Sequence, residues 1–324
     1  MIRIRDISLA PEHDRGALLY EAAKVLGLSA SEIDKATIVR KSVDARKKPE
    51  VKIIYTIDVA LKTGENRVLK RCRNKRVSVA PVSDYQVPKG PSAEDRPVVV
   101  GFGPAGMFAA LVLALAGQKP IVLERGQDAL TRHKKVEEFF ETGRLDPRSN
   151  VQFGEGGAGT FSDGKLNTGV NNPRIGWILE QFVAAGARED ILYDAKPHVG
   201  TDVLLEVVQN LRGRIRSLGG EIRFESQVER LELEGNQLTG LVLTTGEVVK
   251  CRRAVLAIGH SARDTFESLY SQGVPMEPKP FAMGVRIEHK QTAIDRAQYG
   301  RERGALPPAD LPAKAPELQA HCRL

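Results

Sequence analysis

The first 79 residues carry a pattern of apolar positions that predicts a small α+β domain. Apolar residues at positions 2, 4 and 7 alternate with polar ones as in a strand, whereas residues 16–26 repeat apolar positions at helical spacing. A polar turn containing a proline, at 46–50, separates two further alternating segments. The predicted elements are a strand from Ile2, a helix at 16–26, a short helix at 30–35, and paired strands at 38–44 and 51–61.

The amino-acid composition then changes twice, at about residue 80 and at about residue 98. Residues 80–96 are rich in proline, serine and charge, which is typical of a linker. Residues 98–123 are apolar enough to resemble a membrane span, but six glycines and prolines interrupt them. We therefore expect a strand at 98–100, a helix at 107–115 and a second strand at 120–123.

The glycines of this strand–helix–strand unit have the spacing of a dinucleotide-binding motif. Gly101 allows a tight turn, Gly103 lets the backbone approach a pyrophosphate, and Gly106 lets the helix pack closely on the strand. Glu124, at the end of the second strand, is placed to accept hydrogen bonds from ribose hydroxyls and would repel a 2′-phosphate, which disfavours NADP. The alternative is a strand–helix–strand unit that binds nothing.

A second glycine-rich stretch, residues 154–164, contains five glycines. Such a loop exposes backbone N–H groups and suits a flat ring or a pyrophosphate lying against it. The alternative is a mobile surface loop without a ligand.

The pattern continues with a helix at 203–218, for which Thr201 or Asp202 is the expected cap. A strand at 221–226, a three-stranded meander over 228–251 and a buried strand at 254–258 follow, and the last of these ends in Gly259.

Charge is distributed unevenly. The chain has 324 residues and a net charge of +7, and the excess of basic residues lies within residues 1–96. Six of the ten residues at 67–76 are Lys or Arg, but no aromatic residue is interleaved for base stacking, so we expect nucleic-acid binding to be unlikely. The three cysteines are far apart, and the N-terminus lacks an apolar leader, which favours a reducing, cytoplasmic location.

Several motifs together resemble a bacterial family of uncharacterised FAD-dependent dehydrogenases with a glutathione-reductase-like FAD fold. The matching segments are VVVGFGPAGMFAALVLALAGQKPIVLERG at 98–126, VQFGEGGAGTFSDGKLN at 151–167, PHVGTD at 197–202, AIGHSARD at 257–264 and FAMGVRIE at 281–288. The resemblance implies that FAD is held by Gly101, Phe102, Gly103, Pro104, Ala105, Gly106, Glu124, Arg125, Gly156, Gly157, Ala158, Thr160, Ser162, Val228 and Gly259.

The resemblance also implies an α/β fold with a defined domain order. The expected parts are a small basic α+β domain at 1–79, a linker at 80–96, a Rossmann-like FAD-binding domain at 97–272 with the meander at 228–251 inserted, an incomplete, partly antiparallel substrate-side sheet at 273–306, and an irregular tail at 307–324. Because the chain departs from the family pattern near Asp310, we expect a truncated member in which strands at 281–291 lack partners.

The function implied by the resemblance is that of an FAD-dependent oxidoreductase that passes a hydride to or from flavin N5. Its substrate would be an unidentified small molecule, with NAD(P)H or another electron donor or acceptor as partner and no membrane association. The sequence identifies no catalytic residue, no metal-ligand spacing and no redox-active cysteine pair. Two alternatives remain: an RNA- or partner-binding protein that acts through its basic N-terminal domain, and an inactive truncated fragment.

Overall fold

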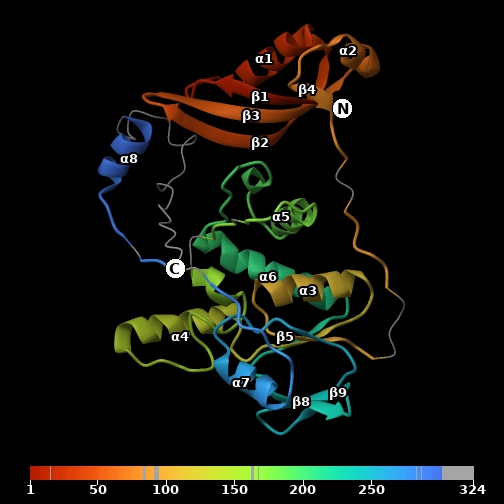
Figure 1. Cartoon of the computed structure of the whole chain (residues 1–324), viewed down its shortest axis with the longest axis vertical. Helices are drawn as coiled ribbons and strands as arrows, with labels where there is room; N and C mark the ends of the chain where they lie inside the picture. Colours follow the sequence, from red (N-terminus) through yellow and green to blue (C-terminus); the bar gives the residue numbers. More distant parts are fainter. Residues whose placement is uncertain are drawn as a thin grey trace. The chain divides into compact units, whose positions relative to one another are not determined.

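The computed structural model of the chain describes residues 1–14, 16–82, 85–90, 95–161, 164–166, 168–281, 283–285 and 287–300. The chain divides into two compact units (Figure 1). The first unit comprises residues 1–83, 189–197 and 279–324, and the second comprises residues 84–188 and 198–278.

The first unit is built on an antiparallel sheet with the strand order β2-β3-β1-β4. Every second residue of the central strand β3 is buried from Val51 to Leu61, because alternate side chains of a strand point to the same face. Helix α1 (Ala17–Leu26) packs on this face and ends at Gly27, which adopts a left-handed φ of 66°. The strands are β1 (Ile2–Leu9), β2 (Ile33–Lys47), β3 (Glu50–Leu61) and β4 (Val77–Val79).

Two details of this unit differ from the sequence prediction. The short helix expected at 30–35 is a single 3-10 turn, Ala30–Glu32, because Ile33 already pairs with Leu61 in the sheet. The basic stretch at 67–76 contributes to helix α2 (Glu65–Arg71) and to the turn before β4, neither of which the apolar pattern had indicated.

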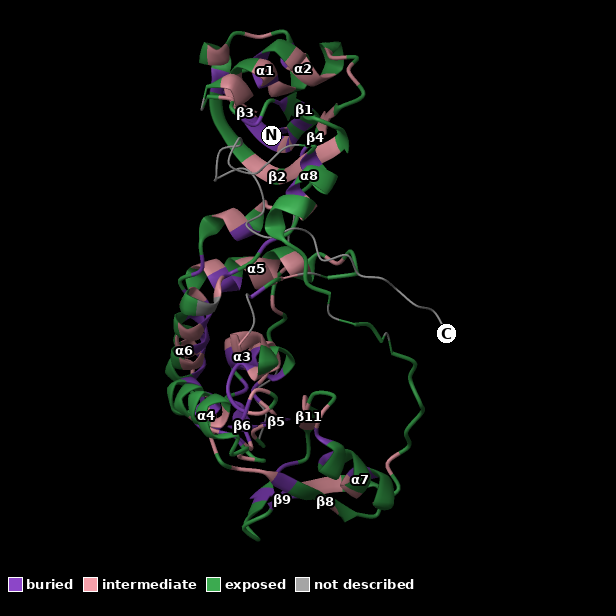
Figure 2. Ribbon diagram, turned by 90° about the vertical axis from the view of Figure 1, so that its left-hand side faces the viewer, coloured by how far each residue is buried: buried purple, intermediate pink, exposed green. Residues whose placement is uncertain are grey.

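The second unit contains a parallel sheet with the strand order β11-β5-β6-β7. All residues of β5 and β6 are buried (Figure 2), as expected for parallel strands covered on both faces. Helices α3 (Pro104–Leu115) and α6 (Thr201–Ser217) pack together on one side of this sheet (Figure 1). The strands are β5 (Val98–Val100), β6 (Ile121–Leu123), β7 (Glu221–Arg223) and β11 (Ala254–Leu256).

The predicted meander covers the other side of the parallel sheet. Its strands β8 (Val228–Glu234), β9 (Gln237–Leu243) and β10 (Val248–Lys250) form an antiparallel sheet in the order β10-β9-β8. Apolar side chains of β5 and β6 share one buried cluster with those of the meander. The mixed α/β fold with a strand–helix–strand unit and a meander is therefore confirmed.

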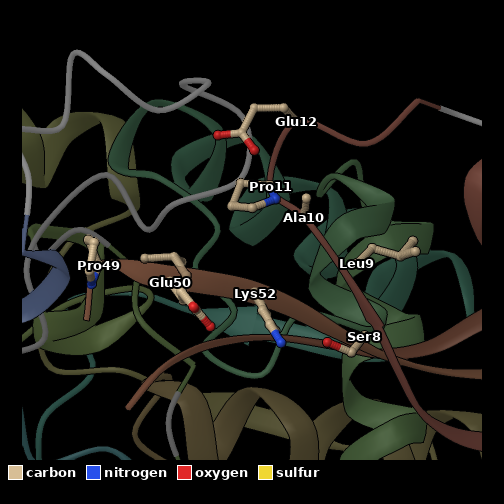
Figure 3. A pocket seen from close by; sticks show the side chains of 9 residues that line it. Ser8, Leu9, Ala10, Pro11, Glu12, Pro49, Glu50 and Lys52 are labelled. Carbon is tan, nitrogen blue, oxygen red and sulfur yellow. The ribbon is translucent and has the colours of Figure 1, made fainter. Parts of the chain in front are cut away.

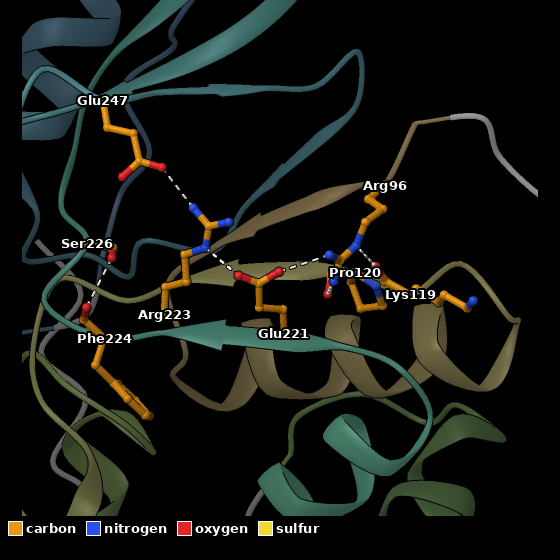
Figure 4. A network of polar contacts seen from close by, with 8 residues as sticks. All are labelled: Arg96, Lys119, Pro120, Glu221, Arg223, Phe224, Ser226 and Glu247. Atoms are coloured by element: carbon orange, nitrogen blue, oxygen red, sulfur yellow. Dashed lines mark hydrogen bonds and ion pairs between the residues drawn. The ribbon is translucent and has the colours of Figure 1, made fainter.

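A chain of ion pairs connects the edge strand β7 to its surroundings (Figure 4). Glu221 accepts hydrogen bonds from Arg96 at 2.9 Å and from Arg223 at 2.6 Å, and Arg223 also reaches Glu247 at 2.9 Å. These bonds, above all the one from Arg223, hold the pKa of Glu221 below its ordinary value. Because Glu247 directly precedes β10, the network ties the parallel sheet to the meander.

The strands expected at 281–291 are not observed. The described residues between 279 and 290 form no strand, and helix α8 (Gln291–Tyr299) follows them. The remaining helices of the described chain are α4 (Ala129–Thr142), α5 (Arg174–Ala184) and α7 (Arg263–Ser271). In the part of the chain that is described, no helix has the length and apolar character needed to cross a membrane.

Candidate functional site

A cavity of about 520 Å³ opens in the second unit where the parallel strands end. The last residues of three neighbouring strands line it, namely Val100 of β5, Leu123 of β6 and Leu256 of β11. Ligands of open parallel sheets bind at this edge, outside the carboxyl ends of the strands. The residues predicted from the sequence that line the cavity are Gly101, Gly103, Pro104, Ala105, Glu124, Arg125, Gly157, Ala158, Val228 and Gly259.

The three glycines of the first loop have different structural roles. A Cβ atom on Gly101 would lie 2.5 Å from the carbonyl oxygen of Ala257, and one on Gly106 would lie 1.9 Å from the carbonyl oxygen of Gly101. Both positions therefore require glycine for the fold itself. Gly103 has an unstrained φ of −72°, and its nearest neighbour to such a Cβ atom is the Cα of Gly157 at 3.8 Å.

Gly103 lines the cavity at the start of helix α3. Gly103 is the N-cap residue and Pro104 is the first helical residue. The first N–H groups of a helix have no partner within it and, together with the helix dipole, favour an anion. Gly103 thus leaves room for an anionic group next to these donors, as the dinucleotide motif requires.

Phe102 and Gly106 lie behind this loop rather than in the cavity. The Phe102 side chain is fully buried and packs edge-on against Phe224, with ring centroids 6.5 Å apart. Its backbone N–H donates to Glu124 Oε2 at 2.6 Å. These two predicted residues support the loop and do not line the cavity.

Glu124 follows β6 directly, and its carboxylate connects three loops. Besides the bond from Phe102, its Oε1 accepts the backbone N–H groups of Gly126 at 2.9 Å and Gly154 at 3.1 Å. A carboxylate offers about four acceptor positions, so one further hydrogen bond to Oε2 fits without breaking the others. Glu124 can therefore bind one ribose hydroxyl from its present position, whereas the sequence had suggested two.

Arg125 forms part of the cavity wall. Its guanidinium lies 4.4 Å from the ring centre of Phe153 and donates to Asp264 Oδ1 and Thr265 Oγ1, both at 2.9 Å. Burial alone would raise the pKa of Asp264, but the hydrogen bonds from Arg125 and from the helix backbone hold it below its ordinary value. These contacts attach the β6 end of the cavity to helix α7.

The second glycine-rich stretch and the residues just before it contact a buried arginine that the sequence pattern does not indicate. Arg132 of α4 is fully buried and donates to the carbonyl oxygens of Asn150, Val151 and Glu155 at 2.6 to 2.9 Å. It also donates to Thr160 Oγ1 at 2.9 Å. Burial lowers the pKa of Arg132 to about 10, so it stays charged at neutral pH. Nothing in the sequence distinguished it from the other charged residues of its helix.

With these hydrogen bonds to Arg132 in place, only part of the second glycine-rich loop lies at the cavity. Gly157 and Ala158 line it, and Gly156 donates its N–H to the carbonyl oxygen of Phe102 at 2.9 Å. Thr160 turns toward Arg132 and the carbonyl oxygen of Gly157. Gly156 and Thr160 are thus supporting residues, and the predicted Ser162 lies outside the described residues.

Glu155, within the same loop, is fully buried. Its Oε2 accepts the N–H of Ala129 at 2.8 Å and Arg212 Nη1 at 2.7 Å, whereas its Oε1 has no hydrogen-bond partner. Burial raises the pKa of Glu155 to about 7. In the sequence, only the glycines around it indicate a site.

The far end of the cavity is mostly apolar. Val228, the first residue of β8, is buried there, and Gly259 has a left-handed φ of 72° with open space where a side chain would project. The apolar lining suits a flat aromatic base. Its other members are Leu256, Ile258, Phe266, Leu269, Val274 and Met276.

A second pocket, of about 340 Å³, lies in the first unit (Figure 3). It is formed by the end of β1 and the start of β3, and its charged side chains are Glu12, Glu50 and Lys52. None of the predicted site residues lines it. Among the described residues no group of His, Cys, Asp and Glu could hold a metal ion.

Two family matches and one relative were found by sequence. Residues 1–60 match a domain of unknown function, DUF8436, and residues 280–321 match the family described as FAD-dependent protein, C-terminal domain-like. The second match confirms the predicted resemblance to FAD-dependent proteins, and it extends beyond Asp310, where the chain was expected to depart from the family pattern. An uncharacterized protein of Clostridium beijerinckii is 46% identical over 301 residues, which are 92% of this chain and 56% of that protein. The chain thus spans little more than half the length of this relative.

Solved structures resemble the chain only distantly. Glycine oxidase from Bacillus cereus is 16% identical, with 56% of this chain and 60% of that chain covered and a TM-score of 0.36. THI4 from Thermovibrio ammonificans is 19% identical, with coverage of 56% and 64% and a TM-score of 0.36.

Proposed function

We propose that the cavity of the second unit binds FAD and that the protein is an FAD-dependent oxidoreductase. The observation that carries the proposal is that Gly103 lines the cavity at the N-terminus of α3, opposite Gly157, where an added Cβ atom would make only an ordinary van der Waals contact. The fold does not need a glycine there, whereas a bound pyrophosphate does. The match of residues 280–321 to FAD-dependent proteins favours FAD among the dinucleotides.

Different residues of the cavity wall would bind different parts of FAD. The N–H groups that begin α3 would hold the pyrophosphate, Glu124 Oε2 a ribose hydroxyl, and the apolar end near Val228 the adenine. Gly157 and Ala158 would lie against the cofactor from the other side. When bound, FAD supplies a flavin ring that accepts or donates a hydride. The substrate would be a small molecule, with NAD(P)H or another electron carrier as partner.

The visible absorption spectrum of the purified protein tests this proposal. We expect a flavin band, either as isolated or after FAD is added and excess removed, and we expect it to bleach on chemical reduction. Anaerobic addition of NADH or NADPH then tests the electron partner. A well-folded protein that stays colourless after incubation with FAD would contradict the proposal.

A further inference from the structure

The buried carboxyl group of Glu155 has no role in the binding of FAD proposed above. It lies between Gly154 and Gly156 in the loop that borders the cavity, and none of its side chain is exposed. One of its oxygens accepts two hydrogen bonds, whereas Oε1 has none. A buried oxygen without a donor is costly for a carboxylate, because that oxygen has lost its hydration without replacement.

Charged groups approach Glu155 from each element packed against it. Helix α6 contributes Arg212 and Arg216, α4 contributes Arg132, and Asp128 is the N-cap residue of α4. Glu124 is bonded to the neighbouring Gly154. Burial, the largest influence, outweighs the arginines and raises the pKa of Glu155 to about 7, so that both of its protonation states are populated near neutral pH.

The loop brings this carboxyl close to the expected position of the pyrophosphate. Gly154 and Gly157, on either side of Glu155 in the sequence, line the cavity. A Cβ atom on Gly157 would lie 3.3 Å from the Cα of Gly103, so the two glycine-rich loops face each other directly. Two phosphate charges at the start of α3 would therefore add to the negative charge around Glu155 and favour its neutral form.

We propose that Glu155 is a positioning residue that takes up a proton when FAD binds, so that the pyrophosphate lies against Gly154 and Gly157 without a buried carboxylate charge beside it. This inference rests on the proposed function. The proton comes from solvent and goes to the carboxyl group, and the hydrogen bonds from Ala129 and Arg212 to Oε2 remain. By linkage, a site that binds a proton together with its ligand binds that ligand more weakly as pH rises.

The affinity for FAD, measured at several pH values by quenching of flavin fluorescence, tests the proposal. For the unaltered protein we expect Kd to rise about three- to tenfold between about pH 6 and pH 8. Glu155→Gln keeps an acceptor for Ala129 and Arg212 but cannot titrate, so its Kd should change little over this range. Glu247→Gln alters an exposed carboxylate outside the cavity and should keep the slope of the unaltered protein. A Glu155→Gln protein with the unaltered slope would overturn the proposal.

A second measurement needs no variant. Calorimetric titration of the protein with FAD near neutral pH, in two buffers of different ionisation enthalpy, gives the number of protons taken up. We expect a measurable fraction of a proton, and an uptake of zero would refute the coupling even where FAD binds tightly. Absence of FAD binding at every pH would instead overturn the proposed function and this inference together.

Discussion

At the scale of single residues, the outer two glycines of the dinucleotide motif, Gly101 and Gly106, contrast with Gly103 between them. Alanine at Gly106 would place a methyl group 1.9 Å from a backbone oxygen, whereas alanine at Gly103 meets only ordinary contacts. We predict that Gly106→Ala strongly destabilises the second unit. Gly103→Ala should lower stability by no more than about 1 kcal/mol, because only a helix N-cap is altered.

The two variants should also differ in cofactor binding. Gly103→Ala should weaken FAD binding at least tenfold while the protein stays folded, because the new methyl group would overlap the proposed position of the pyrophosphate. Thermal unfolding and FAD titration of both variants measure this. Unchanged affinity in Gly103→Ala would place the pyrophosphate elsewhere.

A second prediction at this scale concerns pH and the free energy of unfolding. Burial raises the pKa of Glu155 from its ordinary 4.5 to about 7, so the folded chain binds this proton more tightly than the unfolded chain. The stability contributed by Glu155 is therefore complete below about pH 4.5 and is lost as pH rises through about 7, with a total of up to about 3 kcal/mol. Urea unfolding at several pH values should show this decrease in the unaltered protein. The slope that remains in Glu155→Gln reports the other groups, and identical slopes in both proteins would be inconsistent with a raised pKa.

At the scale of elements, helix α4 and the second glycine-rich loop form one structure through Arg132. The guanidinium donates to the carbonyl oxygens of Asn150 and Val151, which precede the loop, and of Glu155 within it, and none of these residues lies in a helix or strand that could satisfy its carbonyl group. We predict that Arg132→Met destabilises the protein by about 3 kcal/mol or more, because it leaves buried carbonyl groups unpaired. The urea midpoint measures the loss. Arg144→Met, at an exposed position after the same helix, should change stability by no more than about 0.5 kcal/mol.

At the scale of the whole molecule, the candidate site lies within one unit. Every residue that lines the larger cavity belongs to the second unit. A ligand that binds only the folded form of a unit raises the free energy of unfolding of that unit. The increase is about 2.7 kcal/mol at a ligand concentration 100 times Kd. We predict that FAD raises the unfolding temperature of the second unit and leaves that of the first unit unchanged. Calorimetry with and without FAD checks this, and equal shifts for both units would argue against a site confined to the second.

The sequence allowed much of the second unit to be predicted, because its key elements depend on local rules. Valines 98–100 are buried on both faces, and the turns of the meander contain glycines with left-handed backbone. The features that the sequence could not reveal depend on contacts between segments that are distant in the chain. Arg132 and Glu155 become significant only when α4, α6 and the loop meet. Strands at 281–291 were expected from the family resemblance, whereas the described part of that segment forms no strand.

The order in which the first unit receives its parts has a consequence during protein synthesis. Strand β2 lies at the edge of its sheet, and its outer side is covered where Lys41 exchanges backbone hydrogen bonds with Tyr193 and Ala195. The ribosome makes β2 long before these partners leave the exit tunnel. Throughout that interval the nascent chain presents an open strand edge, so chaperone capture and pairing between neighbouring nascent chains compete with its own completion.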